Sequence, residues 1–325
     1  MHSATEVLVL GEALVDLAIG AREETGGGLV MAAHAGGSPA NVAVGLARLG
    51  VRTQFAARIS RQGLGPFLRA HLEESGVDIG LCVDAPQPAT LAIVGVDDGG
   101  TAAYSFYVEG TADWQWERAE LPANDAGAAV HAGSLAIALE PGAQVVATWI
   151  AEQRARGEVY ISLDPNVRPA LVLGLPGYRE RLDSLIAQAH LVKVSDEDLH
   201  ALEPEVEPLT TAMAWAERGP ELVVVTHGAR GATALAAGAK PVHSPGIPVR
   251  VLDTIGAGDA FTSGLLAFFA ERGALRVGAT GVLDPRVVAE ALSFAGRVAA
   301  LTCTRAGSDP PWRAELVAAM TAGSV

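Results

Sequence analysis

One stretch of this chain decides both its fold and its chemistry: Asp253-Thr254-Ile255-Gly256-Ala257-Gly258-Asp259-Ala260-Phe261. Small residues at 256–258 lead directly into a predicted helix, and a carboxylate, Asp259, stands in the first turn. The backbone N–H groups of such a turn, together with the positive end of the helix dipole, bind phosphate oxygens. An aspartate would repel a phosphate that is only bound, but it can remove a proton from an attacking hydroxyl. The stretch therefore predicts a phosphate site with a general base, which is the minimum that a kinase needs.

Composition narrows the classes of partner. The 325 residues carry a formal net charge of −14, which argues against nucleic acid and anionic membrane surfaces. Lysine occurs only as Lys193 and Lys240, and neither follows a G-x-x-x-x-G run, so a P-loop is excluded. There are two cysteines, Cys82 and Cys303, no zinc-ligand spacing, no apolar run long enough to span a membrane and no signal-peptide pattern. These features predict a cytoplasmic protein.

Apolar strand-like runs alternate with helical patterns along the whole chain, which is typical of a doubly wound, mostly parallel α/β sheet flanked by helices. Neither a repeat nor a linker interrupts this alternation, so we interpret residues 1–325 as one domain. The predicted core strands are 7–10, 53–57, 130–132, 159–164, 191–194 and 222–226, and the predicted helices are 39–49, 67–75, 142–155, 178–189, 209–218, 260–271 and 287–301.

Two segments, about 15–33 and 90–108, break this alternation because each holds short apolar runs around a glycine-rich turn and no helix. We predict that they form a small antiparallel β lid, which would exclude water during transfer of a phosphoryl group. Ordinary edge hairpins are the alternative. Apolar lid strands could also pair with those of a second subunit, which predicts a homodimer through the lid.

A glycine-rich helix start, Gly36-Gly37-Ser38-Pro39-Ala40-Asn41, lies near the N-terminus. Its serine suits an N-cap and its proline the first helical position. Gly36 and Gly37 allow a ligand to approach the backbone closely, and Asn41 offers a donor and an acceptor to a pair of hydroxyls. A well-capped helix without a ligand is the structural alternative.

Further polar residues follow the predicted strands, at the sheet edge where ligands bind in such folds. Asp16 could accept two adjacent sugar hydroxyls, although a solvated turn residue is the alternative. In Asp164-Pro165-Asn166-Val167-Arg168-Pro169, the fork of Arg168 could offset charge on a transferred phosphoryl group, and Asn166 could donate to another oxygen.

Two more segments fit a nucleotide site. Asp198 and its acidic neighbours, after Lys193-Val194-Ser195, could hold Mg²⁺ through water, although acidic residues also favour helix starts without a metal. In the stretch 226–231, Thr226 and Gly228 could meet phosphates or ribose, and Gly231 allows the turn. His227 is interpreted as a packed side chain.

In this order, the motifs resemble those of the ribokinase-like (PfkB) carbohydrate kinase family over essentially the whole chain. Residues 36–50 are similar to its first motif and residues 253–264 to its second. The resemblance implies a central sheet flanked by helices, a β lid, and transfer of the γ-phosphoryl group of ATP with Mg²⁺. It makes Asp259 the base and the backbone of Gly256, Ala257 and Gly258 the oxyanion hole.

The resemblance also implies two ion sites. The family's Asn-x-x-Glu motif beside the metal appears as Ser195-Asp196-Glu197-Asp198, which puts Ser195 at the nucleotide and Asp198 near Mg²⁺ through water. Many members hold a potassium-type ion at a backbone site, which here corresponds to Asp253 and Ile255 and the loop 302–308.

Within the family, the loops after residues 164 and 193 look most like fructokinases and 2-keto-3-deoxygluconate kinases. Ribokinases typically carry asparagine two residues before the sugar-binding aspartate, where this chain has Leu14. Glu140 is similar in position to a sugar-contacting glutamate of ribokinases. The family's Gly-Asp-Asp-x-x-Gly turn is replaced by residues 60–65, so Arg58, Arg61 or Gln62 are candidates for a different sugar contact.

We therefore predict an ATP-dependent sugar kinase that phosphorylates a primary hydroxyl, with D-fructose as the first choice of substrate. A 2-keto-3-deoxygluconate kinase or a ribokinase is the alternative. Two further alternatives are a nucleoside kinase, which the 5% aromatic content disfavours, and a sugar-binding protein without catalysis, which has no use for Asp259.

Overall fold

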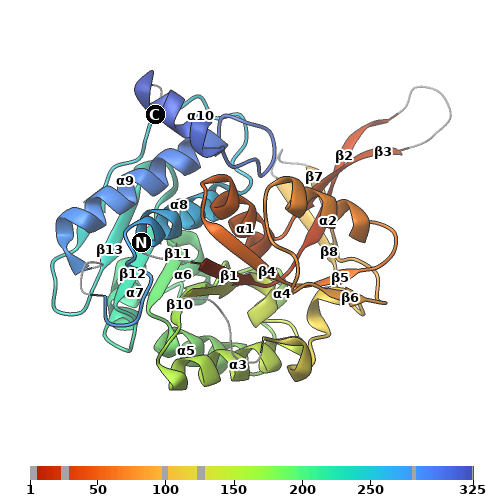
Figure 1. Cartoon of the computed structure of the whole chain (residues 1–325), viewed down its shortest axis with the longest axis horizontal. Helices are drawn as coiled ribbons and strands as arrows, with labels where there is room; N and C mark the ends of the chain where they lie inside the picture. The colour runs from red at the N-terminus through yellow and green to blue at the C-terminus, as the bar shows by residue number, and fades with distance from the viewer. Residues whose placement is uncertain (1–5, 23–28, 97–101, 123–128, 280–282, 324) are drawn as a thin grey trace.

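The computed structural model describes residues 6–22, 29–96, 102–122, 129–279, 283–323 and 325. Its main sheet has eight strands in the order β14-β13-β12-β11-β10-β9-β1-β4 (Figure 1). The pairs from β12 to β4 are parallel, and β13 and β14 add an antiparallel edge. The strands are β1 Glu6–Leu10, β4 Arg52–Ala56, β9 Ala129–Gly133, β10 Tyr160–Asp164, β11 Leu191–Ser195, β12 Leu222–Thr226, β13 Ala232–Leu235 and β14 Val242–Ser244.

Helices cover both faces of this sheet because its strands carry apolar side chains on both sides. In β1, Val7 and Val9 pack into one core with α1, α8 and α9, whereas Leu8 and Leu10 pack into a second core with α3 and α5. Figure 1 shows α3 and α5 on the side of the sheet opposite to α8 and α9. The helices are α1 Ser38–Arg48, α2 Gly65–Glu74, α3 Gly142–Arg156, α4 Pro169–Val172, α5 Tyr178–Gln188, α6 Asp196–Leu202, α7 Pro208–Ala216, α8 Ala257–Glu271, α9 Pro285–Thr302 and α10 Arg313–Thr321.

The six predicted core strands and seven predicted helices are all present, with ends shifted by a few residues. The sequence did not indicate β13, β14, α4 or α10, whereas the acidic helix start after Ser195 is present as α6. β13, β14 and α4 have only three or four residues, which is too few for a detectable period, and α10 buries Leu316 alone among its nine residues, so it has no apolar face. The doubly wound α/β class is confirmed.

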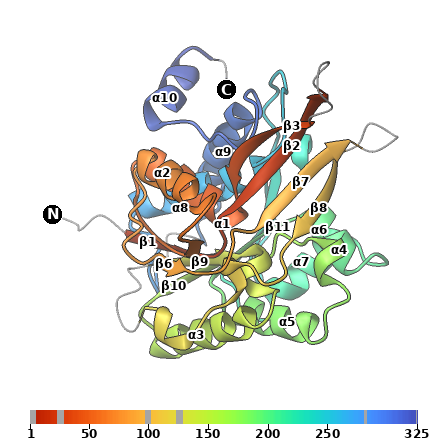
Figure 2. The same cartoon turned by 90° about the vertical axis from the view of Figure 1, so that its right-hand side faces the viewer.

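A second sheet stands to one side of the main sheet, in the order β3-β2-β7-β8 (Figure 2). Its strands are β2 Leu14–Arg22, β3 Leu29–Gly36, β7 Leu91–Val96 and β8 Ala102–Tyr107. The hairpins β2–β3 and β7–β8 are antiparallel, as expected for the lid, but the two hairpins join through a parallel pair, β2–β7. The hairpin tips, 23–28 and 97–101, lie outside the described residues.

The strands β5 Arg58–Ser60 and β6 Val83–Ala85 form a short parallel pair next to α2. Within the described ranges, no helix combines the length and the apolar character that crossing a membrane requires.

Candidate active site

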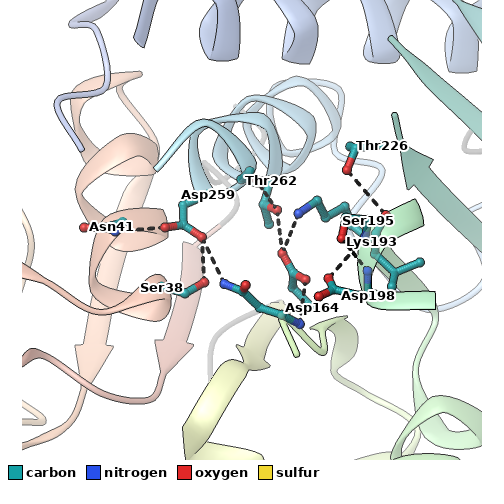
Figure 3. A network of polar contacts seen from close by, with 12 residues as sticks. Ser38, Asn41, Asp164, Lys193, Ser195, Asp198, Thr226, Asp259 and Thr262 are labelled. Atoms are coloured by element: carbon teal, nitrogen blue, oxygen red, sulfur yellow. Dashed lines mark hydrogen bonds and ion pairs between the residues drawn. The ribbon is translucent and has the colours of Figure 1, made fainter. Parts of the chain in front are cut away.

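Polar side chains from distant parts of the sequence meet where the parallel strands end, between the lid and the start of α8 (Figure 3). Because the carboxyl ends of parallel strands lie at one edge of the sheet, the residues after β1, β10, β11 and β12 converge there. Asp259 lies in the first turn of α8 and is 7% exposed. The groups around this carboxylate determine its pKa and the chemistry that the site can perform.

The turn before α8 requires glycine at its first position. Gly256 is the N-cap of α8 and has φ of 74°, in the left-handed region. A Cβ atom there would lie 2.0 Å from Ser308 Oγ. Of the three expected anion-binding amides, that of Ala257 already donates to the Thr254 carbonyl at 3.2 Å. Among the described residues, the N–H groups of Gly256 and Gly258 have no backbone partner, so they are the two that can bind an anion.

Side chains from α1 and from the loop after β10 donate hydrogen bonds to Asp259. Ser38 Oγ donates to Asp259 Oδ1 at 2.6 Å and Asn41 Nδ2 donates to Oδ2 at 2.8 Å. Asn166 Nδ2 donates to Oδ1 at 3.5 Å. Burial raises the pKa of Asp259, and the Ser38 and Asn41 bonds oppose that rise. A buried carboxylate with a raised pKa, held by donors, is suited to accept a proton.

The prediction that Ser38 caps α1 was wrong. The N-cap is Gly37, with φ of 100°, and Ser38 is the first helical residue. Its hydroxyl donates to Asp259, 221 positions away in the sequence, and a hydrogen bond to a charged acceptor is stronger than one between neutral groups. Asn41, expected to meet sugar hydroxyls, donates instead to Asp259.

Asp16 in β2 approaches the same space from the lid. A Cβ atom at Gly36 would lie 2.3 Å from Asp16 Oδ2, so the glycine leaves room for this carboxylate. At Gly37 the Cβ position is filled by the Glu12 carbonyl, 2.6 Å away. Burial raises the pKa of Asp16 to about 6, His34 and Arg168 lower it, and the charge of Asp259 raises it further.

A second group of polar residues lies deeper, at the ends of β10 and β11 (Figure 3). Asp164 Oδ2 accepts from Lys193 Nζ at 2.9 Å and from Thr262 Oγ1 at 3.2 Å. Burial alone would lower the pKa of Lys193, but the carboxylates of Asp164, Asp198 and Asp259 raise it overall. Lys193 therefore remains an ammonium ion near the start of α8.

The loop after β10 positions two expected phosphate ligands. Asn166 has φ of 39°, a left-handed value that asparagine tolerates, and its N–H donates to Asp164 Oδ1 at 3.2 Å. Arg168 Nη1 donates to the Asn166 side-chain oxygen. The guanidinium and the amide therefore stand together at the mouth of the site.

A cavity of about 360 Å³ opens next to this loop. Its walls come from the ends of β10, β11 and β12 and from the start of α8, so it is suited to a ligand with several phosphates. The lining includes the expected residues Asn166, Arg168, Ser195, Asp198, Thr226, Gly228 and Gly258, together with Lys193.

Asp198 is already bonded to the backbone at this cavity. It accepts from Val167 N at 3.0 Å and from Ser195 N at 3.3 Å, and Ser195 Oγ accepts from Asp198 N, which completes a capping box. Burial raises its pKa. Gly231 is not among the cavity residues, because its missing side chain makes room for the Ser244 carbonyl, 2.1 Å from the Cβ position. Its role is to close the turn after β12.

Two residues that were expected to contact the sugar form ion pairs with other side chains. The Arg58 guanidinium is 6% exposed and pairs with Glu120, while Nε donates to the Ala112 carbonyl at 3.2 Å. We therefore correct the assignment of Arg58 to the sugar. Glu140 pairs with Arg181 and is 51% exposed, and it does not line the cavity next to the loop after β10.

The segment before α8 is joined to the loop after α9 by Asp253. Its Oδ1 accepts from Ile255 N at 3.0 Å and its Oδ2 from Gly307 N at 2.8 Å. Ser308 Oγ is buried there without a hydrogen-bond partner in the part of the chain that is described. A buried hydroxyl oxygen without a partner fits a cation with oxygen ligands.

Sequence reasoning missed Lys193, Asp164 and Thr262 as parts of the site. Lys193 carried a signal, because it is a charged residue inside an otherwise apolar strand and such a residue is buried only with a partner. Thr262 carried none, since threonine is ordinary within a helix. A carboxylate base, two anion-binding amides, two cations and a phosphate-sized cavity together can transfer a phosphoryl group to a hydroxyl.

Comparison with known proteins agrees with this geometry. A sequence model described as pfkB family carbohydrate kinase matches residues 4–315. The fructokinase of Rhizobium leguminosarum bv. trifolii is 37% identical over 262 residues, which cover 80% of this chain and 78% of that protein. The crystal structure of fructokinase with bound ATP from Xylella fastidiosa has a TM-score of 0.89 and 28% identity, covering 99% of this chain and 100% of that one.

A crystal structure of a fructokinase double mutant from Vibrio cholerae O395, in a form with fructose, ADP and potassium ion bound, has a TM-score of 0.83. It is 28% identical and covers 97% of this chain and 98% of that one. The fold and the site thus define an enzyme that transfers a phosphoryl group to an alcohol. More narrowly, the chain belongs to the pfkB family of carbohydrate kinases, and it is an ATP-dependent sugar kinase.

Proposed function

We propose that this enzyme transfers the γ-phosphoryl group of ATP to a primary hydroxyl of D-fructose. The observation that carries the proposal is the placement of Asp259, held by Ser38 and Asn41 between the lid carboxylate Asp16 and the amides at the start of α8. The choice of fructose is supported by the names of the relatives, several of which are fructokinases at 30–37% identity.

In the proposed reaction, the carboxylate of Asp259 takes the proton of the sugar hydroxyl as its oxygen forms a bond to the γ-phosphorus. The bond from phosphorus to the β–γ bridging oxygen breaks, and ADP leaves with that oxygen. The N–H groups of Gly256 and Gly258 and the cations of Arg168 and Lys193 stabilise charge on the transferred group. Asp16 holds sugar hydroxyls, and the lid excludes water.

The cavity residues fit Mg²⁺ with ATP, because Mg²⁺ keeps several waters and needs only one or two carboxylates besides phosphates. Asp198 is the carboxylate that would hold it through water, and bound Mg²⁺ supplies positive charge to the phosphate oxygens. The orphaned Ser308 Oγ and the Asp253–Ile255 backbone fit a potassium-type ion. We place the enzyme in the cytoplasm, where its two free thiols remain reduced.

A substrate panel tests the proposal. Purified enzyme with ATP and Mg²⁺ is given fructose, ribose, 2-keto-3-deoxygluconate or adenosine, and ADP formation and the ³¹P spectrum of the product are recorded. Fructose should give the highest kcat/KM. The Asp259→Asn variant should lose about 10²–10⁴-fold in kcat with unchanged ATP affinity, whereas surface Asp183→Asn should match the parent. Preference for another panel member would overturn the choice of fructose.

We also propose that the lid forms a homodimer. Ile19, Met31 and Tyr107 share one lid face by register, opposite to the face that carries Asp16. They are 47%, 37% and 57% exposed, so large apolar side chains of this face meet solvent. Light scattering of the wild type should give twice the mass of the chain, and Ile19→Lys should give the monomer. A monomeric wild type at micromolar concentration would contradict the proposal.

A further inference from the structure

One buried carboxylate, Asp113, ties the roots of two lid strands to the body of the molecule. It lies in the short 3₁₀ turn Ala112–Trp114, just after β8, and is 1% exposed. Its Oδ1 accepts from Ala13 N at 3.0 Å, immediately before β2 begins. Its Oδ2 accepts from Thr90 Oγ1 at 2.5 Å, immediately before β7 begins. Both oxygens are therefore used at the points where the chain enters the lid.

The hydrogen-bond network of Asp113 extends through Thr90 to the part of β2 that carries Asp16. Val15 N donates to the Thr90 carbonyl at 3.0 Å, so Thr90 binds β2 through its backbone and Asp113 through its side chain. The backbone of β2 is thus fixed on both sides of Leu14, and Asp16 is the next residue whose side chain faces the site. Thr111 Oγ1, 2.6 Å from Thr90 Oγ1, extends the network to the Val108 carbonyl after β8.

Burying the carboxyl group of Asp113 lowers the stability of the fold, which is unfavourable for a residue with a purely structural role. Burial raises its pKa to about 6, and its neighbour Glu12 is a second buried carboxyl whose charge repels it. Two carboxyl groups in an apolar interior cost stability, because hydrogen bonds replace their lost hydration only in part. The bonds that Asp113 makes are those that set the direction of β2 and β7.

We propose that Asp113 is a positioning residue that acts through Thr90 and the root of β2 to hold Asp16 toward the sugar hydroxyls and Asp259. This proposal rests on the proposed function, because it takes Asp16 to be a sugar ligand. Asp113 does not touch the substrate. Its effect should therefore appear in sugar binding and not in ATP binding.

The experiment is a double-mutant cycle between Thr90 and Asp16. Thr90→Val keeps the shape of the side chain but removes the hydroxyl from Asp113, and Thr90→Ser restores it. In the otherwise wild-type enzyme, Thr90→Val should raise the KM for fructose about 5- to 50-fold and leave the KM for ATP unchanged. In the Asp16→Asn background the same change should have almost no further effect. Thr90→Ser should lie within about twofold of the wild type.

A matched control is Thr53→Val, because Thr53 is also buried and bonded, to the Val51 carbonyl, but lies at the far end of β4 from the site. It should lower Tm without raising the KM for fructose. Asp113→Asn should behave like Thr90→Ser, since the amide accepts from Ala13 N and donates to Thr90, whose hydroxyl turns to Thr111. Asp113→Ala should behave like Thr90→Val.

The proposal is overturned if Thr90→Val raises the KM for fructose equally in both backgrounds, or lowers only Tm. It is also overturned if Asp16→Asn alone leaves that KM unchanged. These outcomes differ from failure of the proposed function, in which the wild-type enzyme itself phosphorylates no sugar of the panel.

Discussion

At the scale of single residues, the proposed reaction requires ionised carboxylates, although burial opposes their ionisation. Burial raises the pKa of Asp16 to about 6 and raises that of Asp259 as well. Because Asp259 accepts a proton only as the carboxylate, kcat/KM for the sugar should fall as the pH drops through these raised pKa values. With two groups required, log kcat/KM should approach a slope of about 2 against pH in acid.

The dependence of kcat/KM on pH also distinguishes the contribution of Asp16 from that of Asp259. In Asp16→Asn only Asp259 titrates, so the acid slope should decrease to about 1. The measurement is kcat/KM for fructose between pH 4.5 and 8 at saturating ATP. A slope that stays the same in both enzymes would show that Asp16 does not have to be ionised.

Lys193 gives a second prediction at this scale. It is 4% exposed and its partner Asp164 is 1% exposed, so Lys193→Met leaves a buried charge without its counter-ion. We expect a loss of about 3–5 kcal/mol in the free energy of unfolding. Adding Asp164→Asn removes the stranded charge and should recover part of that loss. Urea unfolding of the three proteins checks this, and a double variant no more stable than Lys193→Met would contradict it.

At the scale of elements, the helices and strands were predictable and the contacts of their ends were not. Alternation and helical period located α1, α8 and β1 to within a few residues, because local side-chain patterns specify them. The bond from Ser38 to Asp259 could not be predicted, because the two residues are 221 positions apart and meet only in the folded molecule. Likewise, nothing local shows that β2 pairs in parallel with β7.

The turn before α8 supplies the prediction at this scale. Gly256→Ala puts a Cβ atom against Ser308 and strains a residue with φ of 74°, so the amides that face phosphate should shift. We expect kcat to fall by at least about 10²-fold. The control is Gly273→Ala at the other end of α8, where φ is 64° and nothing lies within 4 Å of the Cβ position. That variant should lose only about 1 kcal/mol of stability and keep its kcat.

At the scale of the whole molecule, the sequence predicts where the site lies but not how the parts around it are connected. Asn166 follows the parallel strand β10, as the rule for ligands at the carboxyl ends of such strands leads us to expect, whereas Asp16 lies within β2 and Asp259 lies in the first turn of α8. The same sequence gives no indication of the buried acid pair, Glu12 and Asp113, which joins the lid to the body. Such a pair depends on three segments that are far apart in the chain, so no local pattern records it.

This acid pair makes the stability of the folded molecule depend on pH. Glu12 is 1% exposed, and burial raises its pKa from 4.5 to about 7; the Ser134 hydrogen bond and Arg168 lower the pKa, and Asp113 raises it. The native state therefore binds this proton more tightly than the unfolded chain does. The contribution of Glu12 is full below about pH 4.5 and is lost as the pH rises through about 7.

Replacing the group by an amide isolates its contribution. Relative to the wild type, Glu12→Gln should gain up to about 3 kcal/mol in the free energy of unfolding between pH 5 and pH 8. The amide oxygen can still accept from Ala136 N, whose bond to Glu12 is 3.2 Å, so the native contact survives. The measurement is urea unfolding at each pH, with the exposed Glu158→Gln as the control that follows the wild type. Parallel curves for Glu12→Gln and the wild type would show that Glu12 titrates alike in the folded and unfolded states, and that its burial does not govern its ionisation.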